Sequence, residues 1–185
     1  MPRRPLPALK SADISARLAA IVRAVPDHPR AGIVFRDITT LLADGPAFRE
    51  TVDAIAAAYA DAAVDVVVGI ESRGFILAGP VAYLLRAGFV PMRKQGRLPA
   101  ATVSVAYALE YGDAVLEVHA DAVTRGQRVL IVDDVLATGG TAAAAIELVE
   151  RLGGVVAGLA FLIELDDLGG SNSLGGRDHI SLISF

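Results

Sequence analysis

Two adjacent carboxylates stand beside a glycine-containing turn in the second half of the chain. The string Val129-Leu-Ile-Val-Asp-Asp-Val-Leu-Ala-Thr-Gly-Gly-Thr141 starts as a buried-strand pattern, carries Asp133 and Asp134, and reaches a turn made of Ala137, Thr138, Gly139, Gly140 and Thr141. Backbone N–H groups of such a turn bind anions together with the dipole of the helix that follows. The turn lacks the lysine of a Walker A loop. The string therefore indicates a site for a phosphate monoester, with the two carboxylates as acceptors for a pair of ribose hydroxyls. Either half alone also fits an Asp-rich turn that caps a helix.

A second candidate for anion binding is Arg73. It stands beside Gly74, directly after the β-branched run Val64–Ile70. At such a strand-to-helix turn, a guanidinium can hold two pyrophosphate oxygens at once. Without the strand and the glycine, Arg73 would look like an ordinary surface arginine.

Composition and charge exclude several classes of function. No apolar run reaches the roughly 20 residues of a membrane-spanning helix, and none follows the basic start of the chain. The net charge is −4 without a basic tract, which argues against a nucleic-acid partner. There is no cysteine, and His28, His119 and His179 lack the spacing of a metal site. We therefore expect a cytoplasmic protein with no metal held by the protein alone.

The hydrophobic pattern predicts strands that alternate with helices. Helices are expected over 11–25, from about Pro46 to Tyr59, from Gly74 to about Arg86, and over 142–152. Strands are expected over 64–70, 89–93, 128–132, 155–165 and 179–185, and a hairpin over about 103–119 that turns at 111–113. Loops are expected over 1–10, 26–45, 94–104 and 169–178. This alternation indicates one α/β domain over 1–185, with a mostly parallel twisted sheet flanked by helices.

The string 129–141 resembles the 5-phosphoribosyl-1-pyrophosphate signature of the type I phosphoribosyltransferases. Further matches narrow the resemblance to the adenine phosphoribosyltransferases: Gly32-Ile-Val-Phe-Arg-Asp37, Glu71-Ser-Arg-Gly-Phe75, Arg93-Lys94 with Gly96-Arg-Leu-Pro99, and Tyr107-Ala-Leu-Glu-Tyr-Gly112. The likeness covers about residues 26–168, and the combination is specific although no single piece is. Gln95 and Arg97 depart from the usual pattern. The resemblance implies transfer of the 5-phosphoribosyl group to adenine, giving AMP and pyrophosphate.

The resemblance also implies roles for the phosphate-binding residues. In that family the two acids hold the ribose hydroxyls and the turn 137–141 holds the 5′-phosphate. Arg73, Arg93 and Lys94 would bind pyrophosphate, and Arg93 would reach the neighbouring subunit of a homodimer. Mg²⁺ would arrive with the pyrophosphate substrate, since it commonly sits on phosphates. A strained, cis peptide is implied in the turn around Arg73.

The base-binding and catalytic assignments depend almost wholly on the family, because a loop phenylalanine is usually core and a strand-end glutamate usually faces water. Phe35 would stack on adenine while backbone groups of Val34 and Arg36 read its edge. Glu110 would take the ring proton as adenine attacks the anomeric carbon. Such a transfer by a placed side chain is typically worth about 10²–10⁴-fold.

Two other functions share part of this pattern. A phosphoribosyltransferase for xanthine or hypoxanthine would differ in residues 32–37 and at Glu110. A non-catalytic regulator that senses 5-phosphoribosyl-1-pyrophosphate would need neither Glu110 nor a closing loop. Residues 94–104 are expected to form that loop, a mobile hood that excludes water from the reacting carbon.

Overall fold

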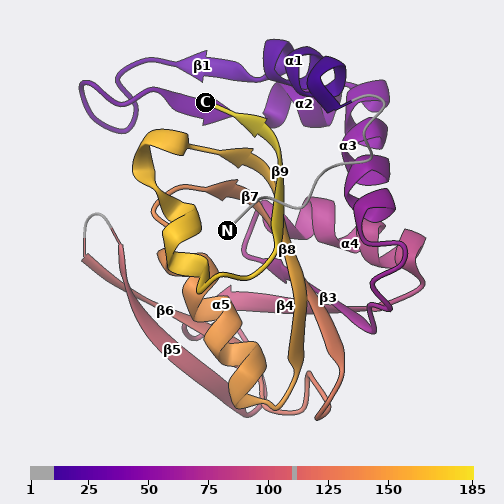
Figure 1. Cartoon of the computed structure of the whole chain (residues 1–185). Helices are drawn as coiled ribbons and strands as arrows, with labels where there is room; N and C mark the ends of the chain where they lie inside the picture. The colour runs from indigo at the N-terminus through magenta and orange to yellow at the C-terminus, as the bar shows by residue number, and fades with distance from the viewer. Residues whose placement is uncertain (1–10, 110–111) are drawn as a thin grey trace.

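A seven-stranded sheet forms the centre of the protein, in a computed structural model that describes residues 11–109 and 112–185 (Figure 1). Its strand order is β5-β6-β4-β3-β7-β8-β9. The bounds are β3 Val66–Ile70, β4 Gly88–Lys94, β5 Thr102–Leu109, β6 Gly112–His119, β7 Arg128–Leu136, β8 Val155–Glu164 and β9 His179–Ser184. Neighbours from β4 to β9 are parallel, whereas β6 runs antiparallel to β4 and β5. The predicted mostly parallel sheet is confirmed.

Helices cover both faces of this sheet. The helices are α1 Ser11–Ile21, α2 Thr39–Ala43, α3 Gly45–Ala58, α4 Gly74–Leu85 and α5 Gly140–Arg151. Figure 1 shows α1 to α4 gathered on one side and α5 with the β5–β6 hairpin on the other. Two short 3-10 helices, η1 Asp166–Leu168 and η2 Gly170–Leu174, connect β8 to β9. In the described part of the chain, no helix is long and apolar enough to cross a membrane.

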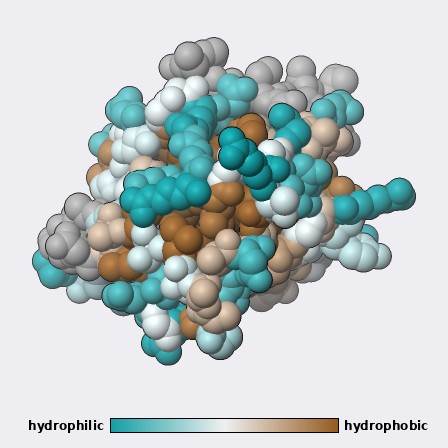
Figure 2. Space-filling view, turned by 90° about the horizontal axis from the view of Figure 1, so that it is seen from below, coloured by the Kyte–Doolittle hydropathy of each residue, from teal (hydrophilic) through white to brown (hydrophobic). Residues whose placement is uncertain are grey.

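The alternation of side chains along the central strands produces two hydrophobic cores. Val67 of β3 and Leu130 of β7 pack on the side of α1 to α4, while Val68 and Ile131 pack on the side of α5. All five residues of β3 are buried. Burial on both faces is the reason that these strands read as continuous apolar runs in the sequence. The underside of the molecule, seen in Figure 2, carries apolar side chains in its middle, surrounded by hydrophilic ones.

The N-terminal quarter differs from the sequence prediction. The expected helix over 11–25 ends at Ile21, and Arg23–Val25 instead form β1, which pairs antiparallel with β2, Phe35–Asp37. Pro26 accounts for part of this change, because the residue before a proline is disfavoured in helical geometry. The expected loop over 26–45 also contains α2, so two of its segments are regular. The start of α3 near Pro46 is confirmed, where the Asp44 carboxylate accepts a 2.9 Å hydrogen bond from the Ala47 N–H.

Two further boundaries shift in ways that affect the site. Strand β7 continues to Leu136 instead of ending at 132, because it stays paired with β8 up to Glu164. The expected open loop over 94–104 is shorter, since Lys94 ends β4 and residues from Thr102 onward pair with β6. The open part is therefore 95–101.

Candidate active site

The candidate residues gather at the carboxyl edge of the parallel strands. The turn that contains Arg73 follows β3, Lys94 ends β4, and the turn 137–141 follows β7. Ligands of open α/β sheets bind at this edge, where the loops after neighbouring strands meet.

The turn 137–141 lines a cavity of about 280 Å³, which we call the turn cavity. Gly139 has φ 83°, in the left-handed region that favours glycine, and immediately precedes α5. The first N–H groups of a helix have no partner inside the helix, so the start of α5 can donate to an anion. Phe161 of β8 and Asp133 of β7 also line this cavity.

The paired acids lie within β7 rather than in the turn after it. Asp134 is buried and forms an ion pair with Arg73 (Nε to Oδ2, 3.0 Å). The Asp134 N–H donates to Asp133 Oδ1 at 2.9 Å. Burial raises the pKa of the Asp133 carboxyl well above its ordinary value, and the neighbouring Asp134 charge raises it further. A ligand that hydrogen-bonds to the charged form of Asp133 would relieve part of that cost.

Arg73 is brought to the acids by a close contact between α4 and β7. A Cβ atom on Gly74 would lie 2.7 Å from Asp133 Oδ1 and 2.9 Å from the Val132 carbonyl oxygen. Glycine at the first position of α4 is therefore what allows this turn to reach the acids. The Glu71–Ser72 peptide is cis, as the resemblance implies.

A second cavity, of about 490 Å³, has basic side chains in its wall, and we call it the basic cavity. The cavity is lined by the basic side chains of Arg73, Lys94 and Arg97 and by the carboxylates of Glu71, Asp133 and Asp134, together with Ser72 and Tyr107. Three basic side chains around one space could bind a strongly charged anion such as pyrophosphate.

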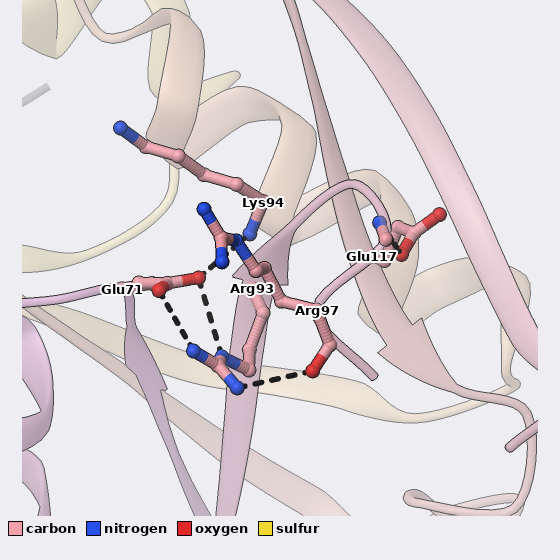
Figure 3. Close-up of polar contacts among 6 residues, drawn as sticks. Glu71, Arg93, Lys94, Arg97 and Glu117 are labelled. Carbon is pink, nitrogen blue, oxygen red and sulfur yellow. Dashed lines mark hydrogen bonds and ion pairs between the residues drawn. The ribbon is translucent and has the colours of Figure 1, made fainter. Parts of the chain in front are cut away.

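Arg93 does not line the basic cavity but holds two residues that do, Glu71 and Arg97, through hydrogen bonds (Figure 3). Its guanidinium forms two hydrogen bonds to Glu71, of 2.9 and 3.2 Å, and a third to the Arg97 carbonyl oxygen at 3.0 Å. Glu71 also accepts the Lys94 N–H at 3.0 Å, and Glu117 accepts the Gly96 N–H at 2.9 Å. The Arg93 hydrogen bonds, followed by that from Lys94, lower the pKa of Glu71, which is therefore ionised at neutral pH.

A third cavity, of about 310 Å³, is mainly apolar, and we call it the apolar cavity. It is lined by the sequence-predicted base residues Val34, Phe35 and Arg36, and by Ile33 and Leu165. The Arg73 guanidinium carbon lies 5.3 Å from the centre of the Phe35 ring. Arg36 in turn stacks at 3.8 Å on the ring of Phe185, the last residue of the chain.

The three cavities are adjacent and share lining residues, and we call them together the cleft. Asp133 and Thr141 line both the turn cavity and the basic cavity, while Arg73 and Asp134 line both the basic cavity and the apolar cavity. The turn cavity and the basic cavity, which are the two candidate anion sites, and the apolar cavity thus lie around the paired acids and Arg73.

The segment 169–178 is more than the solvated loop expected from its sequence. Gly170 and Leu174 are buried, and residues 170–174 form η2 against the back of the turn 137–141. Ser173 Oγ donates to the Thr138 carbonyl oxygen at 3.0 Å. The polar, glycine-rich composition predicts a loop because it does not show which few of these residues are packed.

Glu110, the proposed proton acceptor, lies outside the described residues. The strands on either side of it pair up to Leu109 and Gly112, so the predicted hairpin is confirmed, but Gly112 and Asp113 belong to β6 and not to the turn expected over 111–113. Tyr107 and Ala114, which pair near the turn end of this hairpin, both line the basic cavity.

Comparison with known proteins shows the family to which the chain belongs. The sequence matches the phosphoribosyl transferase domain family over residues 39–171. The adenine phosphoribosyltransferase of Acidothermus cellulolyticus is 59% identical over 163 residues, which cover 88% of this chain and 92% of that protein. The chain belongs to the adenine phosphoribosyltransferases.

Solved structures of adenine phosphoribosyltransferases share the fold. The protein from Thermoanaerobacter pseudethanolicus is 49% identical, with a TM-score of 0.89 over 92% of this chain and 99% of that one. The protein from Saccharomyces cerevisiae, complexed with D-2,5-dideoxy-2,5-imino-altritol 1,6-bisphosphate and adenine, is 36% identical with a TM-score of 0.88, over 92% and 99%. The family and fold class expected from the sequence are thereby confirmed.

Several residues of this adenine phosphoribosyltransferase cleft were missed by sequence reasoning. Arg97 was noted only as a departure from the family pattern, and Ser72, Tyr107 and Leu165 were not singled out for a role. Leu165 carries no sequence signal, since an apolar residue at a strand end looks like core. Arg97 does carry a sequence signal, because it stands four residues after Arg93 in the basic stretch of the expected hood.

Proposed function

We propose that this protein transfers the 5-phosphoribosyl group from 5-phosphoribosyl-1-pyrophosphate to adenine, giving AMP and releasing pyrophosphate. The observation that carries the proposal is the cleft, in which the basic cavity shares Asp133 with the turn cavity and shares Asp134 and Arg73 with the apolar cavity. The substrates divide in the same way, into a phosphate monoester, a pyrophosphate and a flat base joined at a ribose.

The ribose 5-phosphate part belongs to the turn cavity and the acids. The N–H groups at the start of α5 and the hydroxyls of Thr138 and Thr141 donate to the 5′-phosphate. The carboxylates of Asp133 and Asp134 accept hydrogen bonds from the ribose hydroxyls. Their negative charge also favours the positive charge that develops on the ribose as the bond to pyrophosphate breaks.

Pyrophosphate belongs to the basic cavity. Arg73, Lys94 and Arg97 stabilise the negative charge that grows on the leaving group. Within its own chain, Arg93 does not line this cavity but supports its wall, through hydrogen bonds to Glu71 and to the Arg97 carbonyl. Its additional role toward the neighbouring subunit stays a prediction.

Adenine fits the apolar cavity. The Phe35 ring offers a surface for stacking, and the backbone of Val34 and Arg36 offers hydrogen bonds to the base edge, which discriminate between bases better than apolar contact does. Glu110, at the end of the hairpin, would accept the ring proton that adenine loses.

The acids of the cleft also fit a substrate-borne Mg²⁺. In the described part of the chain, no group of three or more acidic or histidine side chains could hold a metal alone. Asp133 and Asp134 are two adjacent carboxylates beside the pyrophosphate cavity, a donor set that suits Mg²⁺ keeping water and phosphate oxygens as its other ligands. When bound, Mg²⁺ would neutralise charge on the leaving pyrophosphate.

A homodimer is supported by exposed apolar surface on α4 and β4. Ile76, Tyr83 and Leu84 recur on α4 at helical spacing and are exposed, Tyr83 at 83%, and Phe89 at the start of β4 is exposed as well. A run of large apolar side chains in water usually marks an interface. The closing movement of the hood and the cytoplasmic location stay predictions.

The proposal is tested by incubating the purified protein with adenine, 5-phosphoribosyl-1-pyrophosphate and Mg²⁺, and measuring AMP and pyrophosphate. We expect equal amounts of both products. The double variant Asp133→Asn/Asp134→Asn should bind 5-phosphoribosyl-1-pyrophosphate at least about 10-fold more weakly, because charge-assisted hydrogen bonds are worth about 1.5–3 kcal/mol. Asp121→Asn, at an exposed position, is the control. No AMP from the wild type, or unchanged affinity of the double variant in calorimetry, would count against the assignment.

A further inference from the structure

The segment after β8 packs against the back of the turn 137–141 at two neighbouring peptides. Ser173 Oγ donates to the Thr138 carbonyl oxygen at 3.0 Å. Gly170 lies so close to the turn that a Cβ atom there would come within 2.2 Å of the Ala137 carbonyl oxygen. From the other side, a Cβ atom on Gly139 would come within 2.4 Å of the Gly170 carbonyl oxygen. The two backbones thus fit together at glycine positions.

These contacts fix the direction of the N–H groups in the turn. In a trans peptide the C=O and the following N–H point in opposite directions. Because the Ala137 and Thr138 carbonyls face η2, the N–H groups of Thr138 and Gly139 point away from it. None of the described residues that line the turn cavity belongs to η2. The two N–H groups therefore face the cavity side of the turn.

We propose that Ser173 is a positioning residue, which keeps the Thr138–Gly139 peptide turned so that its N–H faces the bound 5′-phosphate. The inference rests on the proposed function, since it takes the turn cavity as the 5′-phosphate site. Gly139 has no side chain to resist rotation of this peptide, and glycine accepts both signs of φ. A rotated peptide would point its carbonyl oxygen at the phosphate and repel it.

The remainder of the segment is anchored well enough to serve as a fixed support. Leu174 is 1% exposed and packs in the core on the side of α5. Arg177 forms an ion pair with Glu150 of α5 and donates to the Leu174 carbonyl oxygen at 3.1 Å. The turn and its support are therefore both attached to α5, so Ser173 keeps its place relative to the phosphate site.

The test compares two anions that bind at different places in the cleft. Wild type, Ser173→Ala and the control Ser171→Ala, on the same 3-10 helix, are titrated with ribose 5-phosphate and, separately, with pyrophosphate plus Mg²⁺. Ser173→Ala should bind ribose 5-phosphate about 3- to 10-fold more weakly, as expected for loss of one hydrogen bond. Pyrophosphate affinity should stay within twofold of wild type, as should both affinities of Ser171→Ala.

Steady-state kinetics give a second readout that general damage would not reproduce. The KM for 5-phosphoribosyl-1-pyrophosphate should rise in Ser173→Ala by the same factor, while the KM for adenine stays unchanged. Unchanged affinity for ribose 5-phosphate, or an equal loss for both anions, would overturn the role of Ser173 and leave the proposed function standing. Failure of the wild type to bind ribose 5-phosphate would refute the proposed function itself.

Discussion

At the scale of single residues, the cleft holds a charge that the free protein does not favour. Asp133 lies beside Asp134 on the floor of the cleft, and only Asp134 has an ion pair with Arg73. Burial and the Asp134 charge raise the pKa of Asp133. Binding sites often contain such costly groups, because the ligand supplies the missing partners. Here the partners would be a ribose hydroxyl and a substrate-borne cation.

This cost gives the stability of the free protein a definite pH dependence. The pKa of Asp133 is higher in the folded protein than the ordinary value of 3.8 for an aspartate. The free energy of unfolding therefore falls as the pH rises from 3.8 through the raised pKa. Asp133→Asn removes the charge and keeps an oxygen for the Asp134 N–H. We expect its melting temperature to exceed that of the wild type at pH 7–9, by about 2–4 °C per kcal/mol, and the difference to vanish near pH 4. A difference that is independent of pH would contradict this account.

Glu110 carries the residue-scale prediction about the chemistry. Glu110→Gln keeps the size of the side chain but cannot accept the adenine proton. We expect kcat to fall by about 10²-fold or more, while the KM values change little. Glu147→Gln, at an exposed position on α5, is the matched control and should keep full activity. If Glu110→Gln retained most of its turnover, another group or water would take the proton.

At the scale of elements, the central strands and their helices could be predicted because their patterns are local. Val66–Ile70 is buried on both faces, and Pro46 and Asp44 mark the start of α3. The strands β1 and β2 could not be predicted, since each has three residues and their pairing depends on residues 12 or so positions apart.

Some residues of the candidate site could likewise be predicted from the sequence, and others could not. Residues in motifs, such as Asp133 and Arg73, could be assigned from sequence and lie together in the cleft. Leu165 could not, because an apolar residue after a strand looks like core. Ser173 could not either, because it meets the back of the turn 137–141 only through the return of the chain after β8. Arg93 shows the limit of a motif: its position predicts an anion ligand for the neighbouring subunit, which stays a prediction, but it does not reveal the hydrogen bonds to Glu71 and to the Arg97 carbonyl within the chain.

The contact between α4 and β7 leads to an element-scale prediction with an internal control. Gly74→Ala would place a Cβ atom 2.7 Å from Asp133 Oδ1 and 2.9 Å from the Val132 carbonyl oxygen, so the backbone must move. We expect a loss of about 1–3 kcal/mol in stability and weaker binding of 5-phosphoribosyl-1-pyrophosphate. Gly45→Ala at the first position of α3, away from the apolar face of α4, meets nothing within 4 Å and should keep the stability of the wild type or raise it by up to about 1 kcal/mol. Equal effects of the two substitutions, in denaturant unfolding, would refute the proposed contact.

At the scale of the whole molecule, the exposed apolar stripe of α4 predicts the oligomeric state. Tyr83→Glu places a charge in the middle of the stripe, and we expect sedimentation at micromolar concentration to change from dimer to monomer. Val155→Glu, at an exposed position on β8, is the control and should remain dimeric, since β3 and β7 separate β8 from β4. A wild type that sediments as a monomer with full activity would contradict both the dimer and the shared role of Arg93.

The whole cleft also determines which base is accepted, and we expect that base to be adenine. Val34 and the first two residues of β2, Phe35 and Arg36, line the apolar cavity together with Arg73 and Asp134. The most direct test is to measure kcat/KM for adenine, hypoxanthine and xanthine side by side, with saturating 5-phosphoribosyl-1-pyrophosphate and Mg²⁺. The account predicts a preference for adenine of at least about 10²-fold. A base whose edge has other donors and acceptors would leave the backbone hydrogen-bonding groups of Val34 and Arg36 unpaired. Equal or faster consumption of hypoxanthine or xanthine would contradict it.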